Sequence, residues 1–165
     1  MDLRKLSLGD KIIAASAIVL FIAYFLPWFE ASSEGDGLVG EFSATFNGSD
    51  VNFAWGTLPM LIGLVMLGIV VASKLFDIRL PALPIPWGQA LLAAGALAAL
   101  LVIIKLIIGE DDDAADALGI DVSRSFGIFL AGLAAVGLVV GGYFKSLERD
   151  DTSPTISDPP GNAPF

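Results

Sequence analysis

Residues 87–108 read WGQALLAAGALAALLVIIKLII, an apolar run of 22 residues that contains one charge, Lys105, and one amide, Gln89. A helix needs about 20 apolar residues to cross about 30 Å of hydrocarbon. The run lacks the polar stripe that marks the solvent-facing side of a helix in a soluble protein. It therefore predicts a helix that is surrounded by lipid or by other helices.

Three further apolar runs of similar length lie on either side of it, at about residues 12–29, 57–73 and 126–144. Membrane barrels need short alternating strands rather than continuous apolar runs. We therefore expect an all-α membrane protein with a four-transmembrane-helix bundle. Pro27 predicts that the first helix ends or kinks near residues 23–26, because proline breaks the helical hydrogen-bond ladder.

Composition supports a membrane protein and excludes several kinds of chemistry. The 165 residues are 55% hydrophobic and 16% charged, whereas soluble domains carry about 25% charged residues. The absence of cysteine and histidine excludes a disulfide scaffold, a thiol enzyme, a Cys/His zinc site, haem ligation by histidine and histidine acid–base catalysis. The net charge of −9 argues against nucleic acid as a partner. We expect no cofactor, no metal site and no enzymatic activity.

The distribution of basic residues predicts the orientation. Seven lie before the first run, between the second and third, or after the fourth: Arg4, Lys5, Lys11, Lys74, Arg79, Lys145 and Arg149. Only Arg124 lies in the two other connections, which hold eleven acidic residues. The positive-inside rule then places both termini in the cytoplasm and a net charge of −10 outside the cell membrane.

The first run has an alternative interpretation as a secretory signal that would be cleaved after residues 31–33, Ala-Ser-Ser. Its apolar region is longer than the usual 7–15 residues, and residues 27–30 are bulky where cleavage sites are small. We therefore favour a retained span.

The first outer loop, residues 30–56, has the pattern of a β-hairpin. Apolar and polar residues alternate over 41–46, Asn47-Gly48 is a strong turn signal, and a second alternation follows over 51–55. The apolar face of this extracytoplasmic hairpin would comprise Phe42, Phe46, Val51 and Phe53. We expect this face either to form a lid on the bundle, which we favour, or to be an exposed interaction surface.

The second outer loop, residues 109–125, contains an acidic cluster at residues 110–113 and 116. Clustered carboxylates can bind calcium, but the spacing of an EF-hand loop is absent. We interpret the cluster as a solvated acidic rim.

The polar candidates inside the membrane are Lys105 and Gln89. Lys105 lies only about three residues from the outer end of its span, so we expect its side chain to extend to the interface; a functional role is the alternative. No acidic residue lies in the middle of a span, and no catalytic dyad can be assembled there. Small residues at four-residue steps, such as Gly95 and Ala99, favour close helix packing.

The predicted organisation is a transmembrane domain over 1–145 and a disordered cytoplasmic tail over 146–165, which is rich in proline.

The segments Leu8-Gly9-Asp10-Lys11 and Phe25-Leu26-Pro27-Trp28-Phe29 resemble those of small, uncharacterised four-span membrane proteins of actinobacteria. That resemblance implies the four-span topology and no particular activity. The topology, with strands in the first outer loop, is also similar to that of claudin-like tetraspans. The paired cysteines of the claudin loop are missing here, so a paracellular role is not implied.

The sequence therefore favours a non-enzymatic structural or interaction component of the cell envelope. The alternative is a subunit for permeation of small solutes or cations, and an enzyme ranks third. The expected partners are the lipid bilayer and a membrane protein or a second copy of the chain.

Overall fold

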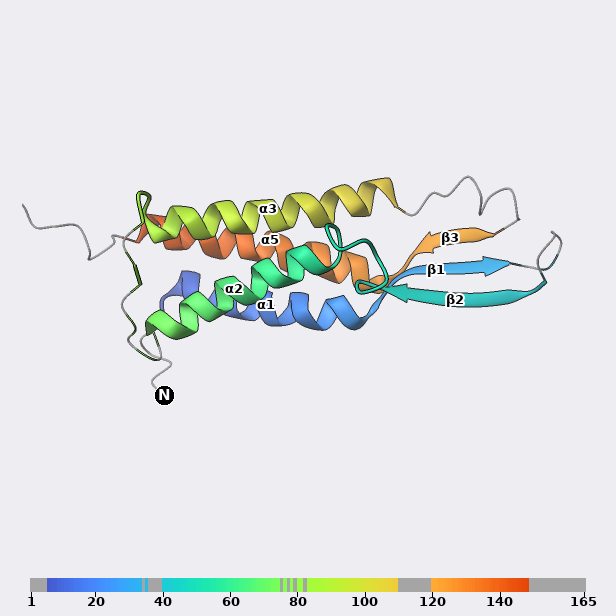
Figure 1. The fold of residues 1–165 in the computed structure, drawn as a ribbon, viewed down its shortest axis with the longest axis horizontal. Coiled ribbons are helices and arrows are strands. Elements are labelled where there is room, and N and C mark those ends of the chain that lie inside the picture. Colours follow the sequence, from blue (N-terminus) through green and yellow to red (C-terminus); the bar gives the residue numbers. More distant parts are fainter. Residues whose placement is uncertain are drawn as a thin grey trace, which may run out of the picture.

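The computed structural model describes residues 6–33, 35, 40–74, 76, 78, 80–81, 83–109 and 120–148. A bundle of long helices carries a small β-sheet that projects from one of its ends (Figure 1). We call this end the sheet end. The opposite end, where α1 begins and α5 finishes, is called the terminal end.

Four helices make up the bundle in the part of the chain that is described: α1 (Leu8–Phe25), α2 (Thr57–Lys74), α3 (Trp87–Ile108) and α5 (Phe126–Leu147). Each is long and apolar enough to cross a membrane. The expected four-helix architecture is thus confirmed, and it fits a multi-pass membrane protein. The bounds of α3 are those expected from the sequence.

Helix α1 begins four residues before the apolar run expected at about residues 12–29, and it ends before that run does. Helix α1 begins at Leu8 because Ser7 and Asp10 form a capping box: the Asp10 amide donates to Ser7 Oγ, and the Ser7 amide donates to Asp10 Oδ2. It ends at Phe25, as Pro27 predicts, and the next residues form a strand. Helix α5 extends to Leu147, three residues beyond the expected end and past the expected start of the tail; residues 149–165 lie outside the description.

Helix α5 packs extensively against both α1 and α3, whereas α2 packs against α1 and, less extensively, against α3. Small residues allow the close approach of α3 and α5. A Cβ atom added to Gly95 would lie 2.9 Å from the Leu138 carbonyl oxygen, and one added to Gly142 would lie 2.7 Å from Leu92 Cα. The backbones of α3 and α5 are therefore in direct contact, as small residues in membrane helices permit.

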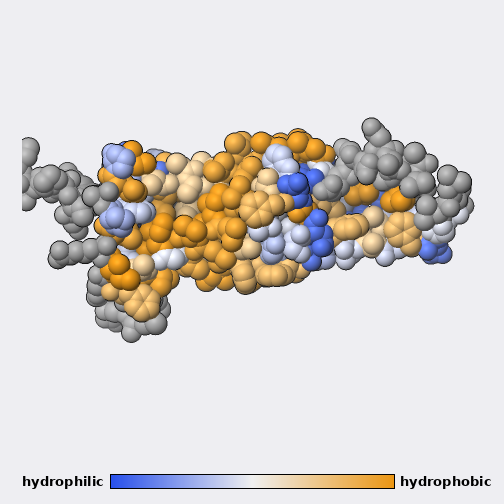
Figure 2. All heavy atoms as spheres, in the orientation of Figure 1, coloured by the Kyte–Doolittle hydropathy of each residue, from blue (hydrophilic) through white to orange (hydrophobic). Residues whose placement is uncertain are grey.

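Large apolar side chains cover the outside of the bundle. Phe129, Leu133, Leu100 and Ile107 are among those that are exposed. Figure 2 shows apolar residues over the helices, and hydrophilic residues where the bundle meets the sheet. A surface of this kind suits hydrocarbon rather than water.

The sheet has three strands, β1 (Pro27–Ser33), β2 (Phe42–Asn47) and β3 (Asp121–Arg124), in the order β2-β1-β3. Both pairings are antiparallel. The strand expected over 41–46 is confirmed as β2, but the prediction that residues 51–55 form its partner strand is wrong. The partner of β2 is β1, which continues directly from the end of α1. The third strand, β3, comes from a distant part of the chain. Pairing between segments that lie far apart leaves no periodic signal in the sequence.

The turn expected at Asn47-Gly48 is present, with a different geometry. Among the described glycines, positive φ angles occur at Gly35 and Gly109 but not at Gly48. A Cβ atom added to Gly48 would lie 2.9 Å from the Tyr24 carbonyl oxygen, to which the Gly48 amide also donates. Glycine is therefore needed here for close approach to α1 rather than for the left-handed backbone of a two-residue hairpin turn.

Candidate interaction surface

The register of the strands divides the sheet into a polar and an apolar face. Residues that lie opposite each other on neighbouring strands share a face. Glu30 lies opposite Thr45 and Ser123, and Ser32 lies opposite Ser43 and Asp121. These six residues define the polar face.

The polar face is open to solvent. Glu30, Ser43, Thr45, Asp121 and Ser123 are all exposed. The Ser43 hydroxyl donates to Glu30 Oε1 over 3.3 Å. The face thus presents hydroxyl groups around a carboxylate on the central strand.

The opposite face is mostly apolar and contains Phe29, Ala31, Phe42, Ala44, Phe46 and Val122, together with Ser33 and Arg124. Its central strand is covered, since Phe29 and Ala31 are buried. At the edge strand the cover is incomplete: Phe42 is half-buried, and Phe46 is 42% exposed.

Lys105 covers Phe29 from the last turn of α3. Its Nζ atom lies 5.3 Å from the centre of the Phe29 ring and donates to the Gly109 carbonyl oxygen over 2.7 Å. The side chain is buried, and it satisfies a carbonyl at the C-terminus of the helix, where a cation is favoured. Lys105 therefore joins α3 to the sheet. Gln89 is exposed in the first turn of α3, sixteen positions or about 24 Å away along the helix, so the structure does not bring the two residues together.

Arg124 has a similar role, which the sequence analysis missed. From β3, its Nε atom donates to the Leu106 carbonyl oxygen over 2.7 Å and its Nη2 atom donates to that of Ile107 over 2.9 Å. The planar guanidinium group thus satisfies two carbonyl groups that the end of a helix leaves unpaired. The available signal was that Arg124 is the only basic residue in either outer connection.

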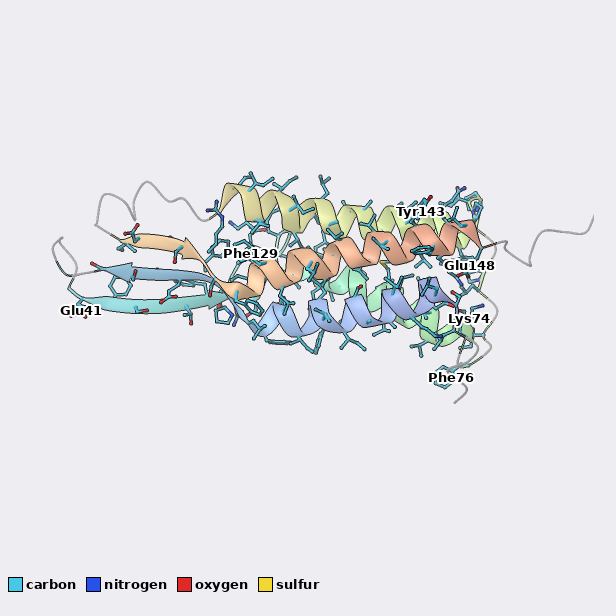
Figure 3. All side chains as sticks on the ribbon, turned by 180° about the vertical axis from the view of Figure 1, so that it is seen from behind. Glu41, Lys74, Phe76, Phe129, Tyr143 and Glu148 are labelled. Atoms are coloured by element: carbon cyan, nitrogen blue, oxygen red, sulfur yellow. The ribbon has the colours of Figure 1, made fainter. Side chains whose placement is uncertain are left out.

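Both cations at the sheet end therefore donate to carbonyl groups at the end of α3, and the described carboxylates are exposed to solvent. Glu30, Glu41, Asp50 and Asp121 are exposed, and none of them forms an ion pair within the described part of the chain. Figure 3 shows Glu41 at the far tip of the sheet. The described surface at this end is consequently anionic.

The four apolar residues expected to form one surface have different environments. Phe42 and Phe46 share the apolar face of the sheet. Val51 is buried in the core of the molecule, and Phe53 is 59% exposed in the turn before α2. The acidic cluster at 110–113 and 116 lies outside the described residues. Among the residues that the structure describes, no group of acidic side chains is arranged to hold a metal ion.

The residues at positions 8–11 and 25–29 have structural roles in this chain. Asp10 is fully buried, and its Oδ1 atom lies 3.0 Å from Nζ of Lys145, which also contacts Glu148 at 2.7 Å. Trp28 is buried and donates from Nε1 to the Ala23 carbonyl oxygen. The first group of residues thus ties α1 to α5 at the terminal end, and the second ties the sheet to α1.

The fold and the surface define a class: a bundle of four apolar helices, fit for a multi-pass membrane protein, that carries an anionic sheet at one end. No model of a known protein family matches the chain, and no curated protein matches it significantly. The function is accordingly inferred from geometry.

Proposed function

We propose that the protein is a multi-pass protein of the cell membrane, with both termini in the cytoplasm, that binds a partner outside the cell through its sheet end and catalyses no reaction. The observation that carries the proposal is the polar face of the sheet. It projects beyond the bundle, is solvent-exposed, and presents carboxylates that no described cation neutralises.

The arrangement of α1 supports retention of the first span. This helix packs against α2 and α5, and its buried Asp10 pairs with Lys145 of α5. Strand β1, which follows directly, is the central strand of the sheet. Cleavage after residues 31–33 would remove a helix of the bundle together with this strand.

The alternative of a permeation subunit has less support, because the described residues provide acidic groups at one end of the bundle but no polar path through it. Among the described residues, the buried polar side chains are Asp10, Ser33 and Lys105, which lie at the ends of helices or in the sheet. A groove of about 270 Å³ between α2 and α3 is lined by apolar residues such as Met66 and Leu91. Ions need polar groups along their path to replace hydration.

Site-specific photo-crosslinking in native membranes tests the proposal. A photoreactive residue at Thr45 or Ser123 is expected to give one discrete adduct, whereas the same residue at Leu133, on the exposed side of α5, is expected to give none of that size. The absence of an adduct at both sheet positions would contradict the proposal. So would cation flux through liposomes that contain this protein alone, since that result supports permeation.

A further inference from the structure

Strand β2 forms an edge of the sheet. In the order β2-β1-β3 it has a neighbour on one side only, and Figure 1 shows it along the outer border of the sheet. An edge strand presents unpaired amide and carbonyl groups that another strand can join. Over its six residues, Phe42–Asn47, this edge is about 20 Å long.

Edge strands of natural proteins are usually protected by lysine, proline or an inward-pointing charge. The residues of β2 are Phe-Ser-Ala-Thr-Phe-Asn, which include none of these. Within the described residues, its pairing with β1 is irregular near Asn47, where the register shifts between Pro27 and Phe29. The edge from Phe42 to Phe46 is therefore suited to accept another strand.

The side chains beside this edge indicate what the added strand would carry. On the polar face, only the small residues Ser43 and Thr45 separate the edge from the Glu30 carboxylate. A lysine or arginine side chain on a neighbouring strand is long enough to lie across them and reach Glu30. On the other face, Phe42 and the partly exposed Phe46 offer apolar contact.

We propose that the β2 edge binds an extended segment of another protein in which basic and apolar residues alternate, and that this segment adds to the sheet as a fourth strand. The inference rests on the proposed function, because it specifies the chemistry of the partner that the sheet end binds. Backbone hydrogen bonds supply affinity in this mode of recognition, and alternate side chains supply specificity.

Charge argues against a second copy of this chain as the occupant. Two copies paired through β2 would bring together two surfaces that each carry Glu30 and Glu41 without a described cationic partner. Like charges that face each other across strands are unfavourable. A basic segment reverses the sign of this interaction.

The test measures binding of a fluorescent seven-residue peptide that alternates lysine and valine to the full-length protein in nanodiscs of neutral phosphatidylcholine. A peptide that alternates glutamate and valine is the negative control. Two charge reversals are compared, Glu30→Lys and Asp121→Lys. They change the net charge equally and lie on the same face, but Asp121 is on β3, the strand farthest from the β2 edge.

We expect the lysine peptide to bind, the glutamate peptide not to bind, and Glu30→Lys to weaken binding about tenfold while Asp121→Lys weakens it no more than about twofold. The conservative variant Glu30→Gln should weaken binding about threefold, which checks the result if Glu30→Lys perturbs the fold. Hydrogen exchange should slow at residues 42–47 when the peptide is bound.

Equal effects of the two reversals, slowed exchange elsewhere than β2, or no binding of the lysine peptide would overturn the inference. Dimerisation through β2 without peptide would overturn it as well. If the peptide fails to bind while photo-crosslinking at the sheet end still captures a partner, this inference fails and the proposed function stands.

Discussion

Asp10 and Arg124 act at opposite ends of the bundle through the same physical principle. Each uses a charged side chain to satisfy groups that a helix terminus leaves unpaired. The capping role of Asp10 could be predicted from the Ser7-to-Asp10 spacing, which is a known N-terminal signature. Its pairing with Lys145 could not be predicted, because the two residues lie far apart in sequence and no periodicity relates them.

Replacement of Asp10 by asparagine is expected to lower the free energy of unfolding by about 2 kcal/mol, since it leaves the partly buried Lys145 with only Glu148. Thermal or denaturant unfolding in detergent measures this change. The control is Lys11→Gln at the adjacent, exposed position, which should change stability by less than about 0.5 kcal/mol. Equal stability of the two variants would show that the buried ion pair does not hold α1 to α5.

Replacement of Arg124 by glutamine is expected to loosen the last turn of α3, because two carbonyl groups lose their donors. Hydrogen exchange at residues 106–109 should accelerate about fivefold. Arg124→Lys should give an intermediate rate, since lysine keeps the charge but not the planar pair of donors. Unchanged exchange in the glutamine variant would refute the capping role.

At the scale of elements, the helices and strand β2 were predictable, whereas strands β1 and β3 were not. Continuous apolar runs such as residues 87–108 indicate membrane-spanning helices directly, because the length and hydropathy of a run are local properties of the sequence. Strand β1 was not predicted because it begins at the end of an apolar run, where Trp28 and Phe29 are buried in a strand rather than in a helix. The candidate surface depends on the register between three separate segments. The sequence therefore predicted Phe42 and Phe46 beside the β2 edge, but none of the residues of the polar face.

Contact between α3 and α5 through glycine predicts contrasting effects of alanine. Gly142→Ala should destabilise the protein by about 1–3 kcal/mol, because its Cβ atom would lie 2.7 Å from Leu92 Cα and the helices would have to separate. Gly68→Ala on α2 should be neutral or stabilising by up to about 1 kcal/mol, because no atom lies within 4 Å of the added Cβ. Unfolding of both variants in the same detergent tests the pair, and similar destabilisation of the two would contradict this packing.

At the scale of the whole molecule, the two ends of the bundle differ in how their charges are used. At the terminal end, Lys145 neutralises buried Asp10 and contacts Glu148. At the sheet end, Lys105 and Arg124 bind carbonyl groups of the α3 terminus, and the described carboxylates face solvent. Figure 3 places Glu41 at one extreme of the molecule and Lys74, Phe76 and Glu148 at the other. This difference in charge between the two ends agrees with the proposed orientation, in which the sheet end lies outside the cell.

The orientation of the sheet is the central claim, and cysteine labelling in intact cells tests it most directly. The chain has no cysteine, so Ser43→Cys on the sheet and Phe76→Cys at the opposite end each introduce a single thiol. Both positions are exposed. A membrane-impermeant maleimide is expected to label Ser43→Cys in intact cells and to label Phe76→Cys only after permeabilisation. Labelling of Phe76→Cys in intact cells, with Ser43→Cys protected, would contradict the account.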